Sequence, residues 1–249
     1  MIEAVPGAEI VDALPALYIR PYKALVVADA HLGYEEEAAR HGVFMPRFQL
    51  ARFLDVLEQA FNTVDAERVI IAGDLKHRFD GLGRLERREV TRAINFIKER
   101  VEEVIVVKGN HDNYLPILKD RLGFELVEHL ILGEYAIIHG HKPLPPEARG
   151  KIVIMGHEHP SIAIRDSIGT VGKFPCFLRG TLKDGVTRVV VLPAIGAYQT
   201  GSKVTLNPST YLSPILKEEA VLEDLEPIIV DEEIGVLELP RLVDMLDFM

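Results

Sequence analysis

An alternation of short β-branched runs with amphipathic stretches is the feature that most constrains this chain. Five runs are short, apolar and rich in Val and Ile, as buried strands are: residues 23–28, 68–72, 103–107, 135–138 and 151–155. Two stretches between them have apolar residues at helical spacing: Leu50, Phe53, Leu54, Leu57 and Phe61 in a helix that starts near Pro46, and Val90, Ala93, Ile94, Ile97 and Val101 in a second helix. This order predicts an α/β fold in which helices cover the outer faces of sheets.

The C-terminal third has a different pattern. Residues 175–182 and 187–192 predict two strands joined by a Lys-Asp-Gly turn at 183–185. From about residue 194 the chain continues as loops, an acidic tail and a short helix. The apolar runs 228–230 and 234–239 could pair with each other or with a neighbouring molecule. Without a repeat or a low-complexity linker, we expect a single domain over residues 1–249, with a C-terminal extension from about residue 194.

Charge and composition narrow the functional classes. The formal net charge of −10 disfavours a protein that binds nucleic acid through a general positive field, although bound metals would add positive charge locally. The sequence has no obvious basic stripe or exposed aromatic series for single-strand stacking, which argues against a processive nuclease. Abundant Glu, Lys and Arg, 15 prolines and glutamine only at 49, 59 and 199 are typical of a thermophilic source.

The same features predict a compartment. The single cysteine, Cys176, excludes an internal disulfide, suits a reducing environment and lies in an apolar strand, where we expect it in the core. No apolar stretch approaches the roughly 20 residues that cross a bilayer. The N-terminus lacks the basic start and apolar run of a secretory signal. We therefore expect a cytoplasmic protein without a membrane segment.

Polar residues follow each of the five predicted strands. These are Asp29 and His31, then Asp74, then Asn110, His111 and Asp112, then His139 and His141, and finally His157 and His159. A Gly-Asp pair alone is more often a turn, and an isolated His pair could be a satisfied pair in the core. Functional groups gather at the carboxyl ends of strands in such sheets, and imidazole with carboxylate suits Mn, Fe or Zn. Five such endings in succession therefore indicate a metal site.

This ordered series resembles the calcineurin-like metallophosphoesterase superfamily over residues of about 23–160. The motifs that carry the resemblance are Asp29-x-His31, Gly73-Asp74, Gly109-Asn110-His111-Asp112, His139-Gly-His141 and Gly156-His157-x-His159. Residues 28–35 (ADAHLGYE), 156–160 (GHEHP) and 175–180 (PCFLRG) further resemble the archaeal and bacterial subgroup associated with DNA ligases or helicases. The resemblance implies a four-layer α/β/β/α sandwich, with two facing mixed sheets, flanking helices and metals at the sheet edges.

The resemblance also implies roles for individual residues. One metal would be bound by Asp29, His31 and His159, the other by Asn110, His139 and His157, and Asp74 would bridge them. Two divalent ions are implied, with Mn expected and Fe, Zn or Ni compatible. A hydroxide shared by the metals would attack phosphorus, and His111, oriented by Asp112, would protonate the leaving oxygen.

Other residues near these motifs have less definite roles. Lys76, His77 and Arg78 follow Asp74 and could contact a substrate phosphate or hold a ligand, or could form a solvated basic loop. His141 is expected beside the ligands, because the motif uses the first histidine of His-Gly-His. The chain also offers residues for the entrance to the site, Tyr34, Arg40 and Phe44, and two histidines expected to be structural, His41 and His129.

The predicted function is hydrolysis of phosphodiester bonds. The same metal core serves phosphomonoesterases, pyrophosphatases and DNA or RNA nucleases, so these remain alternatives. A non-catalytic scaffold for a DNA-processing partner needs no complete ligand set, and here the set is complete. The resemblance implies a nucleotide or nucleic-acid substrate and a DNA ligase or helicase as partner, and it leaves the oligomeric state open.

Overall fold

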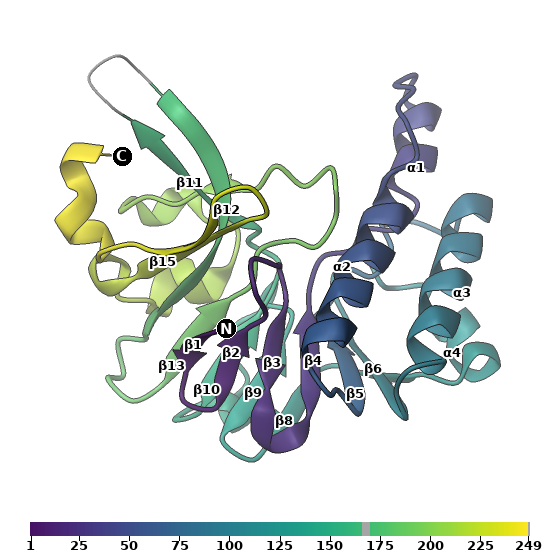
Figure 1. Cartoon of the computed structure of the whole chain (residues 1–249), viewed down its shortest axis with the longest axis horizontal. Helices are drawn as coiled ribbons and strands as arrows, with labels where there is room; N and C mark the ends of the chain where they lie inside the picture. The colour runs from purple at the N-terminus through teal and green to yellow at the C-terminus, as the bar shows by residue number, and fades with distance from the viewer. Residues whose placement is uncertain (166–169, 249) are drawn as a thin grey trace.

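Two β-sheets face each other between helical layers (Figure 1). The computed structural model describes residues 1–165 and 170–248. Within these residues the strands form one seven-stranded and one nine-stranded sheet, both mixed. The predicted α/β fold of two facing mixed sheets flanked by helices is confirmed.

The first sheet has its strands in sequence order. They are β1 (Ile2–Val5), β2 (Ala8–Ile10), β3 (Leu17–Ile19), β4 (Ala24–Val27), β5 (Arg68–Ile71), β6 (Glu103–Val107) and β7 (Glu125–Val127). Strands β1 to β4 pair antiparallel, whereas β4 to β7 pair parallel. The parallel pairing requires long crossovers, which the helices between these strands provide.

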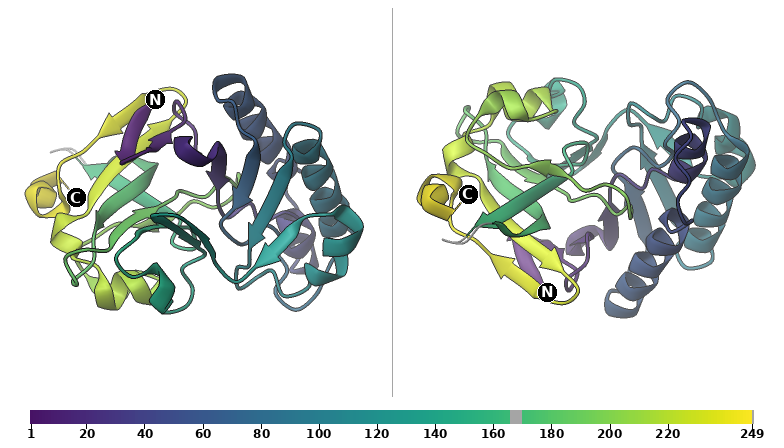
Figure 2. Two further views of the ribbon diagram at one scale, coloured as in Figure 1. Left: turned by 90° about the horizontal axis from the view of Figure 1, so that it is seen from below. Right: turned by 90° about the horizontal axis from the view of Figure 1, so that it is seen from above.

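Four α-helices belong to this half of the molecule: α1 (Tyr34–Arg40), α2 (Gln49–Thr63), α3 (Arg84–Lys98) and α4 (Pro116–Leu122). The predicted apolar faces of α2 and α3 pack on the first sheet, where Phe53, Leu57 and Ile94 are fully buried. Val101 lies beyond the end of α3 but is buried in the same core. Figure 2 shows these blue and teal helices on one side of the molecule and the green and yellow C-terminal elements on the other.

In the second sheet the strands do not follow the order of the sequence. Its strands are β8 (Leu130–Leu132), β9 (Tyr135–Ile138), β10 (Ile152–Met155), β11 (Pro160–Arg165), β12 (Thr170–Thr181), β13 (Arg188–Val191), β14 (Ser202–Lys203), β15 (Glu226–Asp231) and β16 (Gly235–Glu238). The order is β14-β11-β12-β13-β10-β9-β8, and β15 pairs with both β12 and β16. The predicted hairpin is the antiparallel pair β12–β13. The two apolar runs of the tail pair within the chain, as β15 and β16.

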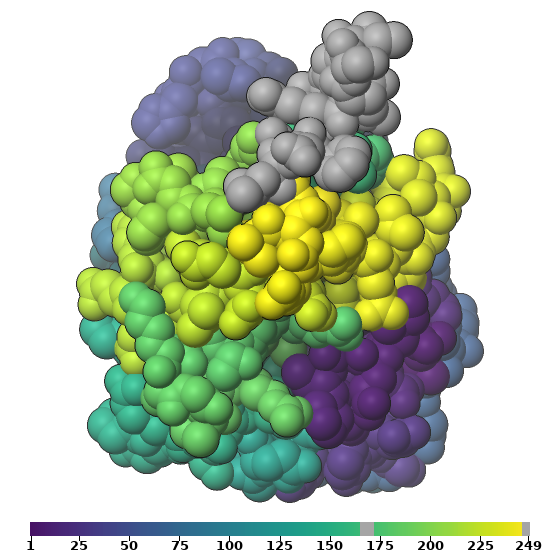
Figure 3. Space-filling view, turned by 90° about the vertical axis from the view of Figure 1, so that its left-hand side faces the viewer, coloured from purple at the N-terminus to yellow at the C-terminus, as the bar shows by residue number. Residues whose placement is uncertain are grey.

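Three apolar cores hold these layers together. One lies between the first sheet and its helices, one between the sheets, and one on the outer face of the second sheet. The third is covered by the C-terminal segment, which forms short helical turns at Ile215–Glu219, Leu222–Asp224 and Leu242–Phe248. Figure 3 shows this yellow segment beside the purple N-terminal strands. Cys176 is buried in β12, as predicted.

Further single-turn helices lie at Arg20–Tyr22, Pro146–Ala148 and Pro208–Thr210. In the part of the chain that the structure describes, no helix combines the length and the apolar character needed to cross a membrane.

Candidate metal centre

The predicted ligands lie in loops at the carboxyl ends of parallel strands from both sheets. Asp29, Asp74 and Asn110 follow β4, β5 and β6 of the first sheet, whereas His139 and His157 follow β9 and β10 of the second. Parallel strands end at the same edge of a sheet, so each group shares one edge. A hydrogen bond from backbone to side chain joins the two edges, because the His157 N–H donates to Asp29 Oδ2 at 2.9 Å.

The side chains gather in two clusters. Asp29, His31 and His159 form the first, with ligand atoms that all lie within 4.8 Å of one another. In it, His159 Nε2 is 3.3 Å from Asp29 Oδ1 and 3.4 Å from His31 Nε2. Two donor atoms at such a separation can both bind one cation at the usual bond length of about 2.1 Å.

The second cluster consists of Asp74, His139 and His157, again with ligand atoms within 4.8 Å. Asn110 joins it, since its Oδ1 is 3.1 Å from His139 Nε2. Asp74 lies between the clusters: its Oδ2 is 3.3 Å from His139 Nε2 and 3.8 Å from His31 Nε2. All seven residues predicted as ligands are therefore in these two adjoining groups.

The backbone of the ligand loops is unusual. Asp29, His31, Asp74, His157 and His159 all have positive φ, between 44° and 69°. Residues other than glycine rarely adopt this backbone conformation. It costs on the order of 1 kcal/mol or more and is concentrated at functional sites. The strand ends thus turn sharply so that their side chains point to a common centre.

Two glycines of the motifs leave room for ligand side chains. A Cβ on Gly109 would lie 2.1 Å from Asp74 Oδ1, and a Cβ on Gly73 would lie 2.1 Å from His139 Nδ1. Both distances are far below a van der Waals contact. The close approach of these side chains favours glycine at both positions, and the positive φ of 93° at Gly73 favours it there a second time.

One buried carboxylate indicates that the site suits a cation. Asp29 is fully buried, and among the described residues its Oδ1 has the close contact with His159 Nε2 but no hydrogen bond of good geometry. A buried carboxylate oxygen without such a hydrogen bond is costly unless a cation neutralises it. Mixed imidazole, carboxylate and amide donors suit Mn, Fe or Zn.

The surroundings of the site shift the pKa values of its imidazoles. Burial lowers the pKa of His31 to about 3 and that of His157 to about 4, so both offer a lone pair at neutral pH. Burial also disfavours a charged His139, but Asp74 outweighs it and raises the pKa of His139 to about 9. A bound cation would displace that proton and take over the neutralisation of Asp74.

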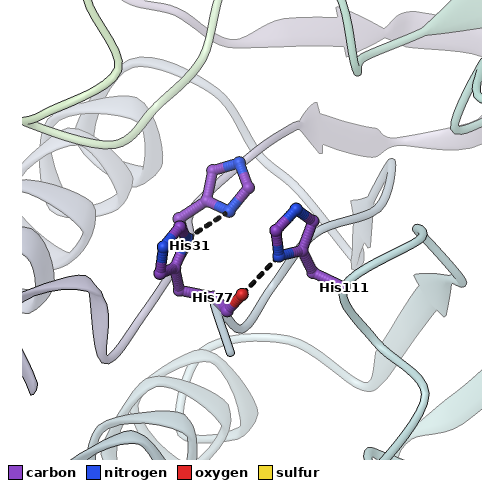
Figure 4. A group of neighbouring side chains, drawn as sticks. All are labelled: His31, His77 and His111. Carbon is purple, nitrogen blue, oxygen red and sulfur yellow. Dashed lines mark hydrogen bonds between the residues drawn. The ribbon is translucent and has the colours of Figure 1, made fainter. Parts of the chain in front are cut away.

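A third group of histidines adjoins the first cluster (Figure 4). His77 Nδ1 is 3.2 Å from His31 Nδ1, and the His111 Nδ1 donates to the His77 carbonyl oxygen. The His77 and His111 rings are stacked with centroids 5.3 Å apart. The contact between the two rings is of the kind by which one side chain can hold another in orientation, and this role for His77 stays a prediction.

Asp112, predicted to orient His111, has backbone groups as its hydrogen-bond partners. Asp112 is fully buried, and its carboxylate accepts the backbone N–H groups of Gly109, at 2.9 Å, and Lys76, at 3.3 Å. It therefore fastens two loops of the site together. The His111 ring is held instead by the His77 carbonyl, and the His111 N–H donates to Asp74 Oδ1.

The remaining predicted residues are distributed around this centre. Lys76 is buried and donates to the Arg78 carbonyl, whereas the Arg78 guanidinium pairs with Asp80 at 2.7 Å. The ring of His141 is 5.1 Å from that of His139, beside the ligands as expected. His129 belongs to none of the three clusters.

The three residues suggested for the entrance have different surroundings. The Tyr34 ring is 4.7 Å from that of His77 and therefore belongs to the site. Arg40 instead pairs with Glu37 at 3.0 Å, as the exposed His41 does at 3.3 Å. Phe44 is 85% exposed on the loop between α1 and α2.

Several residues of the site were not predicted. Tyr198 stacks on Tyr34 with ring centroids 5.4 Å apart. Gln49 accepts the N–H groups of Ala197 and Tyr198 and donates to Gln199 Oε1 at 2.7 Å, which anchors this loop. The only hint in the sequence was the rarity of glutamine, since two of its three positions meet here.

A protein-family model and several solved structures are similar to this chain. A model of the calcineurin-like phosphoesterase family matches residues 22–161. The crystal structure of Pseudomonas putida nuclease MPE is similar, with a TM-score of 0.62 and 23% identity over 91% of this chain and 92% of that chain. The E. coli phosphoesterase Yfce gives a TM-score of 0.43 and 16% identity over 88% of this chain and 98% of that chain. No curated protein sequence matches the chain.

Proposed function

Because this chain belongs to the calcineurin-like phosphoesterase family, we propose that it hydrolyses phosphodiester bonds at a centre that holds two divalent metal ions. The observation that carries the proposal is the completeness of the ligand set: two clusters of three adjoin, and Asp74 lies between them. A scaffold protein has no use for so many strained and buried polar residues, whose cost is offset when they bind metal.

In this proposal Asp29, His31 and His159 hold one ion, and Asn110, His139 and His157 hold the other, with Asp74 shared. Mn²⁺ is the proposed metal, and Fe, Zn or Ni suit the same donors. When bound, the pair of ions would lower the pKa of water and neutralise charge on the phosphate oxygens. The protein fixes the spacing of the donors through its strand ends.

His111 is the proposed general acid. Its Nδ1 donates to the His77 carbonyl, so the proton for the leaving oxygen would be carried by Nε2 of the doubly protonated ring. The His77 ring stacks on that of His111, and the backbone N–H of His111 donates a hydrogen bond to Asp74. Both contacts support a fixed position of His111 at the edge of the clusters. We propose that Asp112 contributes by fastening the loops, not by contact with the acid.

A nuclease is the alternative within this class, in line with the fold that the chain shares with Pseudomonas putida nuclease MPE. The closer sequence resemblance extends the proposal to a DNA ligase or helicase as partner. We also propose that residues 1–249 act as one domain, since the segment after residue 194 covers the second sheet and reaches the site through residues 197–199.

The test is a metal-dependence assay. Chelated protein would be given Mn, Mg, Zn or Ni and offered bis-p-nitrophenyl phosphate beside p-nitrophenyl phosphate. We expect turnover to return with Mn and to favour the diester; preference for the monoester would replace the proposal with a phosphatase. Protein that binds no metal would return the scaffold to consideration.

One variant distinguishes a general acid from a metal ligand at position 111. His111→Ala should keep both metals, measured by elemental analysis, and lose on the order of 10²–10⁴-fold in turnover of diesters with poor leaving groups. Loss of metal from this variant would contradict the assignment of His111 as an acid.

A further inference from the structure

The outward face of α3 carries four arginines. Arg84, Arg87, Arg88 and Arg92 are all exposed, and their spacing of i, i+3, i+4 and i+8 places them on one side of the helix. The opposite side, with Val90, Ile94 and Ile97 among its residues, is buried in the core. In the sequence these arginines do not form an obvious basic stripe, because glutamates alternate with them in RLERREVTR.

These arginines have no acidic partner in the described part of the chain. Most other arginines there form ion pairs: Arg20, Arg40, Arg52, Arg68, Arg78, Arg100, Arg149, Arg179 and Arg241. Among the arginines with described side chains, those outside these pairs are Arg47, Arg84, Arg87, Arg88, Arg92, Arg121 and Arg188. All but Arg188 lie on α3 or next to it: Arg121 donates to Thr91 Oγ1 on α3, and Arg47 lines a cavity together with Leu85 of α3.

The nearby glutamates do not cancel this charge at the surface. Glu86 is buried and accepts the backbone N–H groups of His77 and Arg78. Glu89 is buried and accepts the Gly33 N–H at 2.8 Å. Glu36 accepts the backbone N–H groups at the start of α3. A chain with a net charge of −10 therefore presents a local excess of positive charge along one helix.

This face adjoins the metal centre. Glu86 links the first turn of α3 to the loop that contains His77. On the same loop Phe79 is 58% exposed, and its ring centroid is 5.8 Å from that of His111. Phe44 and Phe48, which flank Arg47 in sequence, are also exposed. Guanidinium groups match phosphate oxygens, and exposed aromatic rings stack on bases.

We propose that Arg84, Arg87, Arg88 and Arg92 of α3, together with Arg47, form an arginine face that binds the phosphate backbone of a polynucleotide whose scissile bond reaches the metal centre. The inference rests on the proposed phosphodiesterase function, and it assigns the substrate to the polymeric diesters. A row of cations along a helix matches a chain of regularly spaced phosphates, whereas a small diester carries only one.

The experiment compares two substrates and two sets of variants in the full-length, metal-loaded protein. Binding of a fluorescently labelled oligodeoxynucleotide is measured by anisotropy at several salt concentrations, and turnover is measured on bis-p-nitrophenyl phosphate. The variants are Arg88→Ala, the double variant Arg88→Ala/Arg92→Ala and the control Arg188→Ala, which removes an exposed, unpaired arginine from β13.

We expect the double variant to bind the oligonucleotide on the order of tenfold more weakly, and its slope of log affinity against log salt to flatten by about 1.4, which is about 0.7 for each lost phosphate contact. Its turnover of the small diester should remain at the wild-type level, and Arg188→Ala should match the wild type in both assays. A purely structural role for these arginines would instead lower both readouts together.

The proposal is overturned if the double variant binds the oligonucleotide as tightly as the wild type, or if Arg188→Ala weakens binding equally. Turnover of the small diester without any binding of the oligonucleotide would refute the arginine face and leave the phosphodiesterase intact. Binding that depends on α3 without turnover of the diester would refute the proposed activity and leave the arginine face intact.

Discussion

A buried carboxylate beside the site should make the stability of this protein depend on pH in a defined direction. Glu89 is 4% exposed, and burial raises its pKa from 4.5 to about 7, with the negative charge of Glu35 adding to the effect. The folded protein thus binds the proton more tightly than the unfolded chain. The stabilisation by the protonated carboxyl is complete below pH 4.5 and is lost as the pH rises to about 7.

The size of this effect follows from the pKa difference. Each pKa unit corresponds to about 1.4 kcal/mol, so the ionised Glu89 costs the folded state on the order of 3 kcal/mol above neutral pH. Glu89→Gln removes the ionisation, and its amide oxygen can still accept the Gly33 N–H. We expect the free energy of unfolding of the variant, relative to the wild type, to increase by about that amount between acidic and mildly alkaline pH.

The assay is urea unfolding followed by circular dichroism across this pH range. A buried amide adds an offset of its own, but the offset is the same at every pH, so the prediction concerns only the change with pH. Glu58→Gln, at an exposed position of α2, is the matched control and should run parallel to the wild type. A Glu89→Gln curve that also stays parallel to the wild type would refute the reasoning.

Three further substitutions probe the site and the core. Asp74→Asn removes the charge that raises the pKa of His139; metal affinity, measured by calorimetry, should fall by at least on the order of tenfold, and full metal binding would mean a different centre. Gly109→Ala places a Cβ 2.1 Å from Asp74 Oδ1, so elemental analysis should show depleted metal in a protein whose circular dichroism is native; normal metal content would show that the loop adapts. Phe53→Ala empties a fully buried position of α2 and should lower the free energy of unfolding by about 3–5 kcal/mol in urea titrations, whereas a loss below about 1 kcal/mol would mean that the core collapses around the gap.

The elements that could be predicted from the sequence are those with a strong pattern of their own. The strands β4, β5, β6, β9 and β10 are continuous apolar runs because both of their faces are buried. The strands β1, β2 and β3 have only three or four residues each, interrupted by the Pro6-Gly7 turn and by Asp12 to Pro15. Such short segments become strands only because β4 offers an edge to pair with, and no local pattern carries that information.

The candidate site shows the same division. The series of polar residues after buried strands indicated which side chains would meet, because topology alone carries strand ends to a common edge. The orientation of His111 could not be inferred in this way, since it depends on the conformation of the loop after Asp74, which brings the His77 carbonyl to the ring. Gln49 and Tyr198 are nearly 150 residues apart, and only the packed structure places them in contact.

The C-terminal segment contributes to the candidate metal site although it supplies none of the predicted ligands. Glu158 lies between two of them, His157 and His159, and is fully buried. It accepts the backbone N–H groups of Leu212, at 2.8 Å, and Ser213, at 2.9 Å. The Ser213 hydroxyl donates in turn to the Gly140 carbonyl, directly after His139.

Ligand loops with left-handed backbone are held in place only when their surroundings over-determine them. Here the loops that carry His139, His157 and His159 are tied to one another through residues 212–213, far along the chain. Strand ends place the ligands near the centre, and these buried hydrogen bonds fix their direction. The same segment therefore contributes both to the third apolar core and to the geometry of the candidate site.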